Sequence, residues 1–273
     1  MEGLLGKNAL VTGGSSGIGQ SIAVRLSQEG ANVAVNYLRD VNQAQETQEL
    51  IQHAIEDSAH VIEGHGHRCL LVQADVSSEE EIDAMVRRTI DELGGIDIVV
   101  NNAGIQIGGA SDEATVESFD RVLGVNLRGA FITAQRTIRH FLAEDKPGVI
   151  INVSSVHEVI PKPRFLSYSV SKGGMQNLTR TLALEYARRK IRVNGIAPGA
   201  TVTPINRAWI DDPEKRVEVE SHIPMGRAAE AEEMGAVTAF LCSDDAAYVT
   251  GQTIFVDGGL TLYPDFRTAW SSE

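Results

Sequence analysis

Near its N-terminus the chain reads Asn8-Ala9-Leu10-Val11-Thr12-Gly13-Gly14-Ser15-Ser16-Gly17-Ile18-Gly19, an apolar run that passes directly into a glycine-rich turn. Glycines let the backbone approach a pyrophosphate, and a helix that follows offers free N–H groups and its positive end. The spacing is Gly-x-x-x-Gly-x-Gly rather than the usual Gly-x-Gly-x-x-Gly. We therefore predict a cofactor turn formed by Gly13, Ser15, Ser16, Gly17, Ile18 and Gly19. An ordinary tight strand–helix turn is the alternative.

Short apolar runs alternate with helical patterns along the rest of the chain. Strands are predicted at 8–11, 32–36, 69–74, 96–100, 149–153, 191–196 and 253–256, and helices near 17–30, 41–58, 79–93, 115–143, 165–189 and 230–242. Continuous apolar strands joined by helices indicate a parallel sheet that is covered on both faces. The fold class is therefore α/β, a single doubly wound (Rossmann) parallel sheet of about seven strands. Ligands bind such sheets outside the carboxyl ends of the strands.

We predict one domain over residues 1–273, because no Pro/Ser-rich linker divides the chain. Residues 40–68 are polar and long for one crossover. Residues 200–226, rich in proline and charge, are expected to lie over the strand ends as a lid or substrate loop.

Composition excludes several classes of function. The net charge of −13 argues against nucleic acid or an anionic membrane as the main partner. Cys69 and Cys242 show no metal or redox spacing, and four of the seven histidines fall in 53–67 without completing a metal-ligand pattern. No signal pattern or membrane-length apolar run is present. We expect a cytoplasmic protein that binds no metal.

Two further strand ends are predicted to contact a dinucleotide. The second strand ends Val35-Asn36-Tyr37-Leu38-Arg39, without the carboxylate that commonly binds the ribose of NAD. Arg39 is expected to face a 2′-phosphate, which slightly favours NADP; if it is only a solvated charge, NAD serves equally well. Asp75 and Val76 follow the third strand and are expected to contact the adenine, although Asp75 could instead cap the helix at 79.

Two more segments complete the predicted cofactor site. Asn102, Ala103 and Gly104 follow the fourth strand and are expected to pass under the cofactor. Pro198, Gly199, Thr201 and Thr203 follow the sixth strand, where they are expected to bind the nicotinamide carboxamide.

The segment Tyr168-Ser169-Val170-Ser171-Lys172 places a phenol and an ammonium on one face of a predicted helix, at positions i and i+4. A nearby cation eases deprotonation of a tyrosine, whose pKa is ordinarily about 10. Ser155 lies thirteen residues upstream, where its hydroxyl can hold a substrate oxygen against the phenol. Asn126 lies within a helical pattern, where asparagine is unfavourable unless its side chain is engaged.

Together these residues resemble the short-chain dehydrogenase/reductase family, over essentially the whole chain. The resemblance rests on Thr12–Gly19, Asn101–Gly104, Asn126, Ser155, Tyr168, Lys172 and Pro198-Gly199. It implies that Tyr168 is the general acid/base and that Ser155, rather than Ser154, is the catalytic serine. By the same resemblance Lys172 binds the nicotinamide ribose and lowers the tyrosine pKa, and Asn126 anchors a water of a proton relay. The family is usually tetrameric through helices corresponding to 115–143 and 165–189.

Within that family, the second half of the chain is similar to the bacterial glucose 1-dehydrogenases, in segments such as Ser154–Pro161 and Glu220–Gly226. This resemblance implies oxidation of a sugar at C1 to the lactone with NAD or NADP. Gln106 stands where such enzymes commonly carry an acid, and Lys162 and Arg164 add positive charge near the site. Gln106 and His157 are candidate substrate contacts. A 3-oxoacyl-thioester or other ketone reductase using NADPH is the nearest alternative, and a non-catalytic nicotinamide-binding sensor is another.

Overall fold

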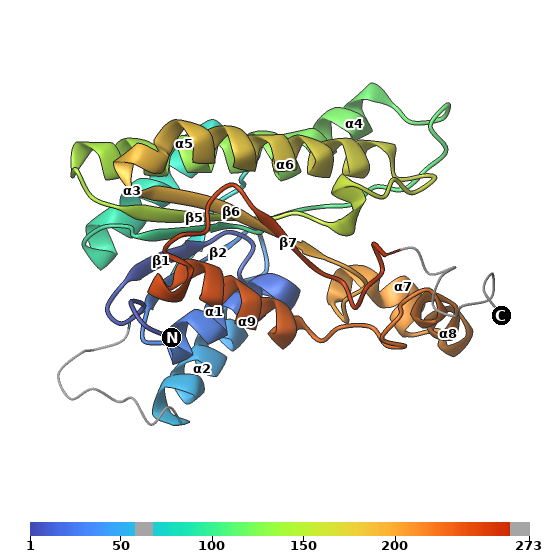
Figure 1. Ribbon diagram of the computed structural model, residues 1–273, viewed down its shortest axis with the longest axis horizontal. Coiled ribbons are helices and arrows are strands. Elements are labelled where there is room, and N and C mark those ends of the chain that lie inside the picture. The colour runs from blue at the N-terminus through green and yellow to red at the C-terminus, as the bar shows by residue number, and fades with distance from the viewer. Residues whose placement is uncertain (58–67, 263–273) are drawn as a thin grey trace.

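The computed structural model describes residues 1–57 and 68–262. In these residues seven strands form one parallel sheet in the order β3-β2-β1-β4-β5-β6-β7 (Figure 1). The strands are β1 Asn8–Val11, β2 Asn32–Tyr37, β3 Cys69–Gln73, β4 Ile98–Asn101, β5 Gly148–Val153, β6 Ile191–Pro198 and β7 Thr253–Val256. The order of the strands along the sheet reverses between β1 and β4. The loops that follow these two strands therefore open at the same edge of the sheet. The predicted doubly wound α/β fold is confirmed.

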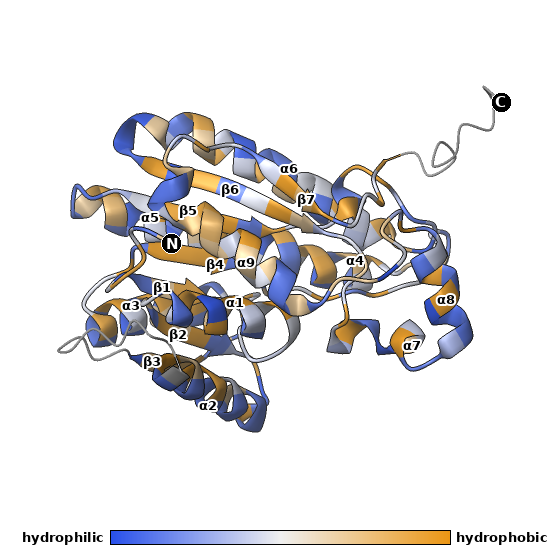
Figure 2. Cartoon of the chain, turned by 60° about the horizontal axis from the view of Figure 1, so that its bottom comes forward, coloured by the Kyte–Doolittle hydropathy of each residue, from blue (hydrophilic) through white to orange (hydrophobic). Residues whose placement is uncertain are grey.

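Helices cover both faces of the sheet (Figure 1). One layer contains α1 Gly17–Gln28, α2 Val41–Asp57 and α9 Ala231–Cys242; the other contains α3 Glu79–Leu93, α4 Val116–Leu123, α5 Ala130–Ala143 and α6 Leu166–Tyr186. Short 3-10 turns span Val156–Glu158, Ala187–Arg189, Pro204–Asn206 and Asp244–Ala246. The strands are mainly hydrophobic in Figure 2, as expected for strands buried on both faces. Leu10 packs into one core and its neighbours Ala9 and Val11 into the other, because side chains alternate along a strand.

The predicted helix over 115–143 is interrupted in the structure. A π-helical segment, Gly124–Gly129, separates α4 from α5. A Cβ at Gly129 would overlap the carbonyl oxygen of Val76, so this glycine permits close approach to the loop after β3. Such widened turns are frequent at functional sites, and this one carries Asn126.

Residues 200–226, expected as a lid or loop, contain two short helices, α7 Arg207–Ile210 and α8 Pro213–Ser221 (Figure 1). The start of α8 is built on Asp212, whose side chain accepts hydrogen bonds from the N–H groups of Glu214 and Lys215. A capping aspartate followed by proline at the first helical position is a helix-start signal that the sequence prediction did not use.

Several absences apply to residues 1–57 and 68–262 alone. None of the helices there is long and apolar enough to cross a membrane. No group of three or more His, Cys, Asp or Glu side chains in the same ranges could hold a metal ion. Histidines 60, 65 and 67 of the predicted histidine-rich stretch lie outside the described residues. Cys69 and Cys242 are free thiols, and burial raises the pKa of each to about 12.

The end of α9 is held by the neighbouring strand, which yields a stability prediction. Arg192 of β6 donates from Nη1 and Nη2 to the carbonyl oxygens of residues 241–243, at 2.7 to 3.3 Å. Hydrogen bonds from charged groups contribute roughly 1.5–3 kcal/mol. We expect Arg192→Met to lower the free energy of unfolding by about 2 kcal/mol, measured by urea denaturation.

Arg88→Met provides the matched control for that experiment. Arg88 pairs with Glu92 on the exposed face of α3, and its loss should change stability by less than about 0.5 kcal/mol. Equal stability of the Arg192 and Arg88 variants would contradict the proposed anchoring of α9.

Candidate active site

A cavity of about 830 Å³ opens at the carboxyl ends of the strands. Its wall contains every residue that the sequence predicted to bind the cofactor, namely Gly13, Ser15, Ser16, Gly17, Ile18, Gly19, Arg39, Asp75, Val76, Asn102, Ala103, Gly104, Tyr168, Lys172, Pro198, Gly199, Thr201 and Thr203. Ser155 and the two predicted substrate contacts, Gln106 and His157, line the same cavity. Of the predicted site residues, Asn126 alone lies behind the wall.

At Gly13 and Gly19 of the glycine-rich turn, the neighbouring atoms leave no room for a side chain. A ligand can therefore approach the bare backbone of the turn closely. The Nδ2 of Asn102 donates to the carbonyl oxygens of Thr12 and Gly13, both at 2.9 Å. Gly13 has φ +60°, and a Cβ there would lie 2.9 Å from the Cα of Ala103. A Cβ at Gly19 would overlap the oxygen of Gly13. The turn leads into α1, whose N-cap Ser16 makes no side-chain cap, so the first N–H groups can receive a phosphate.

Asn36 fixes this turn from β2 and was not predicted as a site residue. Its Oδ1 accepts from the N–H of Gly13 at 3.1 Å, and its Nδ2 donates to the carbonyls of Val72 and Ala74 at 3.2 and 3.1 Å. The side chain thus joins three strand ends. The sequence feature that could have predicted this role is the presence of an asparagine inside the otherwise apolar run 33–37.

The adenosine end of the cavity has few free carboxylates. Asp40 accepts from the N–H groups of Asn42 and Gln43, which makes it a helix cap for α2. Asp75 accepts hydrogen bonds from the N–H and Oγ of Ser77 at 2.8 and 2.7 Å. The alternative that Asp75 caps the helix at 79 is wrong, because the N-cap of α3 is Ser78. Arg39 is exposed and forms no ion pair within the described part of the chain.

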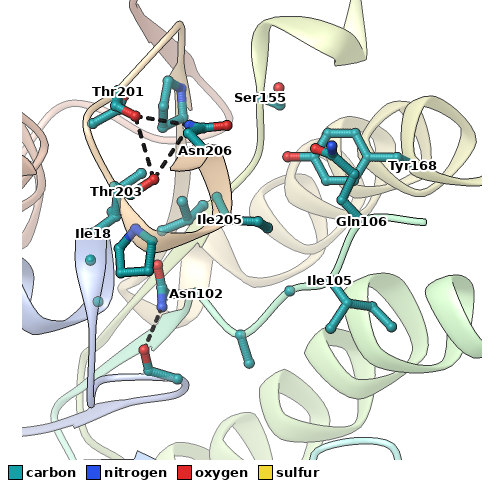
Figure 3. A pocket seen from close by; sticks show the side chains of 18 of the residues that line it. Ile18, Asn102, Ile105, Gln106, Ser155, Tyr168, Thr201, Thr203, Ile205 and Asn206 are labelled. Carbon is teal, nitrogen blue, oxygen red and sulfur yellow. Dashed lines mark hydrogen bonds between the residues drawn. The ribbon is translucent and has the colours of Figure 1, made fainter. Parts of the chain in front are cut away.

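Ser155, Tyr168 and Lys172 meet at the end of β5. Ser155 and Tyr168 both line the cavity, and in Figure 3 the Tyr168 hydroxyl projects into the pocket on the side where Ser155 lies. Lys172 follows Tyr168 by one turn of α6, and its Nζ donates to the carbonyl oxygen of Val153 at 2.8 Å. The ammonium lies 5.5 Å from the centroid of the Tyr168 ring, and only 3 % of Lys172 is exposed. Lys172 is therefore a buried group of the site and not a solvated surface lysine.

The electrostatics of this trio differ from the expectation. Burial raises the pKa of Tyr168 above its usual value, and the Ser155 hydrogen bond opposes this rise only in part. Lys172 is not among the groups that act on this pKa, so its predicted lowering of the Tyr168 pKa stays a prediction. Burial also lowers the pKa of Lys172 to about 8, because a charged amine loses its hydration there.

Glu158 is the acidic partner of this buried amine. Its charge raises the pKa of Lys172 and so opposes the effect of burial. One carboxylate oxygen accepts from the Nε2 of Gln176 at 2.7 Å, whereas Oε2 is buried and has no hydrogen-bond partner among the described residues. A buried carboxylate oxygen without a donor is costly, and its attraction for the Lys172 ammonium offsets part of that cost. Glu158 was not predicted as a site residue.

Asn126 is engaged through its side chain, as its position in a helix suggested. Its Oδ1 accepts from the N–H of Ile105 at 2.8 Å, and its Nδ2 donates to the carbonyl of Ile105 at 3.0 Å and to Ser171 Oγ at 3.1 Å. Ser171 in turn donates to the carbonyl of Tyr168 at 2.7 Å. Asn126 therefore positions both the loop after β4 and the start of α6. Its predicted role in a water relay stays a prediction.

The substrate end of the cavity combines polar and apolar walls. Gln106 is exposed on the loop after β4 and lies on the same side of the pocket as Tyr168 in Figure 3. The Nδ1 of His157 lies 2.8 Å from the carbonyl oxygen of Ile160, which fixes Nδ1 as the donor and leaves Nε2 as an acceptor. Burial lowers the pKa of His157, which favours this neutral tautomer. Further wall residues that were not predicted individually are Ile105, Phe165, Ile205, Trp209, Val219, His222, Ile223 and Leu260.

Comparison with known proteins agrees with this geometry. The family model described as enoyl-(acyl carrier protein) reductase matches residues 13–261. A 3β-hydroxysteroid dehydrogenase 1 of Eggerthella lenta is 49 % identical over 97 % of this chain and 98 % of its own length. A glucose 1-dehydrogenase of Gluconobacter oxydans is 46 % identical over 98 % of this chain and 96 % of its own.

A solved structure extends the similarity to three dimensions. The 3-ketoacyl-(acyl-carrier-protein) reductase of Brucella melitensis, complexed with NADH, has a TM-score of 0.84 and 35 % identity, and the match covers 95 % of this chain and 100 % of that chain. The glycine-rich turn, the seven-stranded sheet and these relatives agree: the chain is an NAD(P)-dependent oxidoreductase and belongs to the short-chain dehydrogenase/reductase family.

Proposed function

We propose that the protein oxidises a hydroxyl group on a ring carbon of a small molecule, with D-glucose at C1 as the first candidate and the lactone as product. The observation that carries the proposal is the pairing of Ser155 and Tyr168 hydroxyls above the buried Lys172 in one cavity with the glycine-rich turn. A phenol, a second hydroxyl and a cation placed together suit the transfer of one proton to or from a substrate oxygen.

The protein residues have separate tasks in this reaction. Ser155 holds the substrate oxygen, and Tyr168 takes the hydroxyl proton as the carbonyl double bond forms. When bound, the nicotinamide supplies the acceptor for the hydride, so the two electrons of the broken C–H bond leave with the hydrogen. Lys172 holds the cofactor ribose and keeps a positive charge near the phenolate.

We favour NADP over NAD as the cofactor, although the family uses either. Arg39 lines the cavity just beyond β2, and its guanidinium suits a 2′-phosphate. The adjacent carboxylate, Asp40, is engaged as the cap of α2 and is therefore a poor ribose ligand. Assays with both cofactors test this preference directly.

Two classes of ring substrate are supported by different parts of the wall. Gln106, His157 and Asn206 offer hydrogen bonds that a sugar would use. Phe165, Trp209 and neighbouring aliphatic side chains instead favour an extended apolar ring system, such as that of a 3-hydroxysteroid. A ketone or acyl-thioester reductase using NADPH is the remaining alternative within the family, and it would use the same proton donor.

The first prediction tests the reaction and its proton carrier. We expect the purified protein to reduce NADP or NAD when D-glucose or a 3-hydroxysteroid is added. The reaction is measured from the absorbance of the reduced nicotinamide. Tyr168→Phe should lower kcat by about 10²–10⁴-fold, because general acid–base help is lost, while cofactor binding is retained.

Tyr186→Phe, near the end of α6 and outside the cavity wall, is the matched control and should retain activity. Turnover by Tyr168→Phe at the wild-type rate would refute the mechanism. If neither ring substrate is oxidised but NADPH is consumed with ketones or acyl thioesters, the result would favour the reductase alternative.

The second prediction concerns pH. Proton transfer at Tyr168 depends on the positive charge that Lys172 keeps near the phenolate. Activity should therefore fall as Lys172 loses its proton near its pKa of about 8. Glu158→Gln removes the charge that raises this pKa, so the descending limb of kcat/KM against pH should move to lower pH.

Glu185→Gln, at an exposed position of α6, serves as the control for the loss of one negative charge. Superimposable pH profiles for wild type and Glu158→Gln would contradict the assignment of Glu158.

The third prediction concerns assembly, and we propose a homotetramer. The layer formed by α4, α5 and α6 exposes large apolar side chains, including Phe131 at 43 %, Val170 at 44 % and Leu184 at 86 %. Such surfaces are typical of subunit interfaces. Light scattering on the eluted protein should give four times the chain mass of 29.4 kDa; a monomer at micromolar concentration would contradict this proposal.

A further inference from the structure

The charge of the cavity wall is opposite to that of the whole protein. The chain carries a net charge of −13, yet Asp75 supplies the sole carboxyl group of the wall within the described residues. That carboxylate is engaged by Ser77 at the adenosine end. Lys162 lines the cavity on the loop between β5 and α6, and Gln106, which lies beside Tyr168 in Figure 3, is neutral. The wall at the substrate end therefore carries the Lys162 ammonium and no carboxylate, since Glu158, whose charge acts on Lys172, does not line it.

Lys162 is held next to the reaction centre by an aromatic wall. Its Nζ lies 4.4 Å from the centroid of the Phe165 ring, a cation–π contact. The Phe165 ring is 6.4 Å from the Tyr168 ring and 6.0 Å from the His157 ring. The ammonium is thus separated from the catalytic phenol by one aromatic side chain. No ion pair in the described residues uses Lys162.

The backbone presents this lysine in a restrained turn. Pro161 and Pro163 flank it, which fixes φ on both sides and restricts the residue before each proline. The N–H of Phe165 donates to the carbonyl of Lys162 at 3.2 Å and closes the turn. Arg164 adopts φ +70°, a left-handed conformation that a non-glycine residue adopts at a cost.

A second contact ties the turn to the loop after β4. The N–H of Gly109 donates to the carbonyl of Arg164 at 2.9 Å, which joins the loop that carries Gln106 to the turn that carries Lys162. Backbone strain retained beside a reaction centre is a recurrent feature of functional sites. The Arg164 side chain, in contrast, does not line the cavity.

We propose that Lys162 selects substrates that carry a carboxylate on the part of the molecule away from the reacting hydroxyl. This inference rests on the proposed function and narrows it to acidic ring alcohols or hemiacetals, such as a hexuronate rather than a hexose. The apolar wall accommodates the ring, Ser155 and Tyr168 engage the hydroxyl, and the ammonium on Phe165 receives the carboxylate.

The experiment compares kcat/KM for a carboxylate and its primary amide, which differ in charge but hardly in shape. The pair is D-glucuronate and D-glucuronamide, or a 3-hydroxysteroid carboxylate and its amide if the steroid ring is the one oxidised. Wild type should prefer the carboxylate by about fivefold, the size expected of an exposed ion pair, and added salt should reduce this ratio.

Two variants of the turn at residues 161–165 distinguish the effect of Lys162 on this ratio from a general effect of positive charge. Lys162→Gln should bring the ratio close to one, because kcat/KM for the carboxylate should fall by more than kcat/KM for the amide. Arg164→Asn removes a charge from the same turn, tolerates the left-handed conformation, and should keep the wild-type ratio. Equal use of the two substrates by wild type, or an unchanged ratio in Lys162→Gln, would overturn the inference. Failure of the proposed function would be distinguishable from failure of this inference, because neither the sugar nor the steroid substrates would then be oxidised.

Discussion

The amide of Asn102 holds the glycine-rich turn against the end of β4, and the whole cavity depends on that contact. Asn102 donates to the carbonyl oxygens of Thr12 and Gly13, while Asn36 binds the N–H of Gly13 from the other side. These bonds satisfy turn groups that the β-ladder cannot reach. A helix with free N–H groups then starts where three parallel strands end, which creates a binding edge for a phosphate-containing cofactor.

A buried amine is the second constraint, and it links the fold to the chemistry. Lys172 is almost fully buried, and such a position strongly disfavours its charge. The carbonyl of Val153 at the end of β5 and the carboxylate of Glu158 offset this penalty. Because the Ser155 hydroxyl lies two residues beyond Val153, the end of one strand positions both the amine and the serine beside Tyr168.

Different parts of the cavity wall serve cofactor binding and substrate binding. The glycine turn and the β3 and β4 loops provide a nucleotide groove, whereas α7, α8 and the Pro161–Phe165 turn shape the substrate end. The catalytic residues Ser155 and Lys172 are buried, whereas Gln106 and Lys162, at the substrate end, are exposed. Substrate choice can therefore change without disturbing the proton-transfer groups, which agrees with the sequence similarity to both steroid and glucose dehydrogenases.

Local chemistry made most of the fold and the catalytic set predictable. Alternating apolar runs and helical periods indicate a parallel sheet, because a strand buried on both faces must be continuously apolar. The spacing of Tyr168 and Lys172 on one helix face, and the glycines of the first turn, were equally direct. Asn36 and Glu158 were missed because their partners lie far away in sequence, and α8 was missed because its Asp212-Pro213 start signal was not weighed.

The sequence by itself determined the layer architecture, the cofactor turn and the proton-transfer groups, since these follow from periodicity and from residues a few positions apart. The tertiary structure alone decided the direction of the Tyr168 pKa shift, the tie between Asn126 and Ile105, and the position of Lys162 over Phe165. Those properties arise from desolvation and from contacts between separate elements, and no local pattern encodes either.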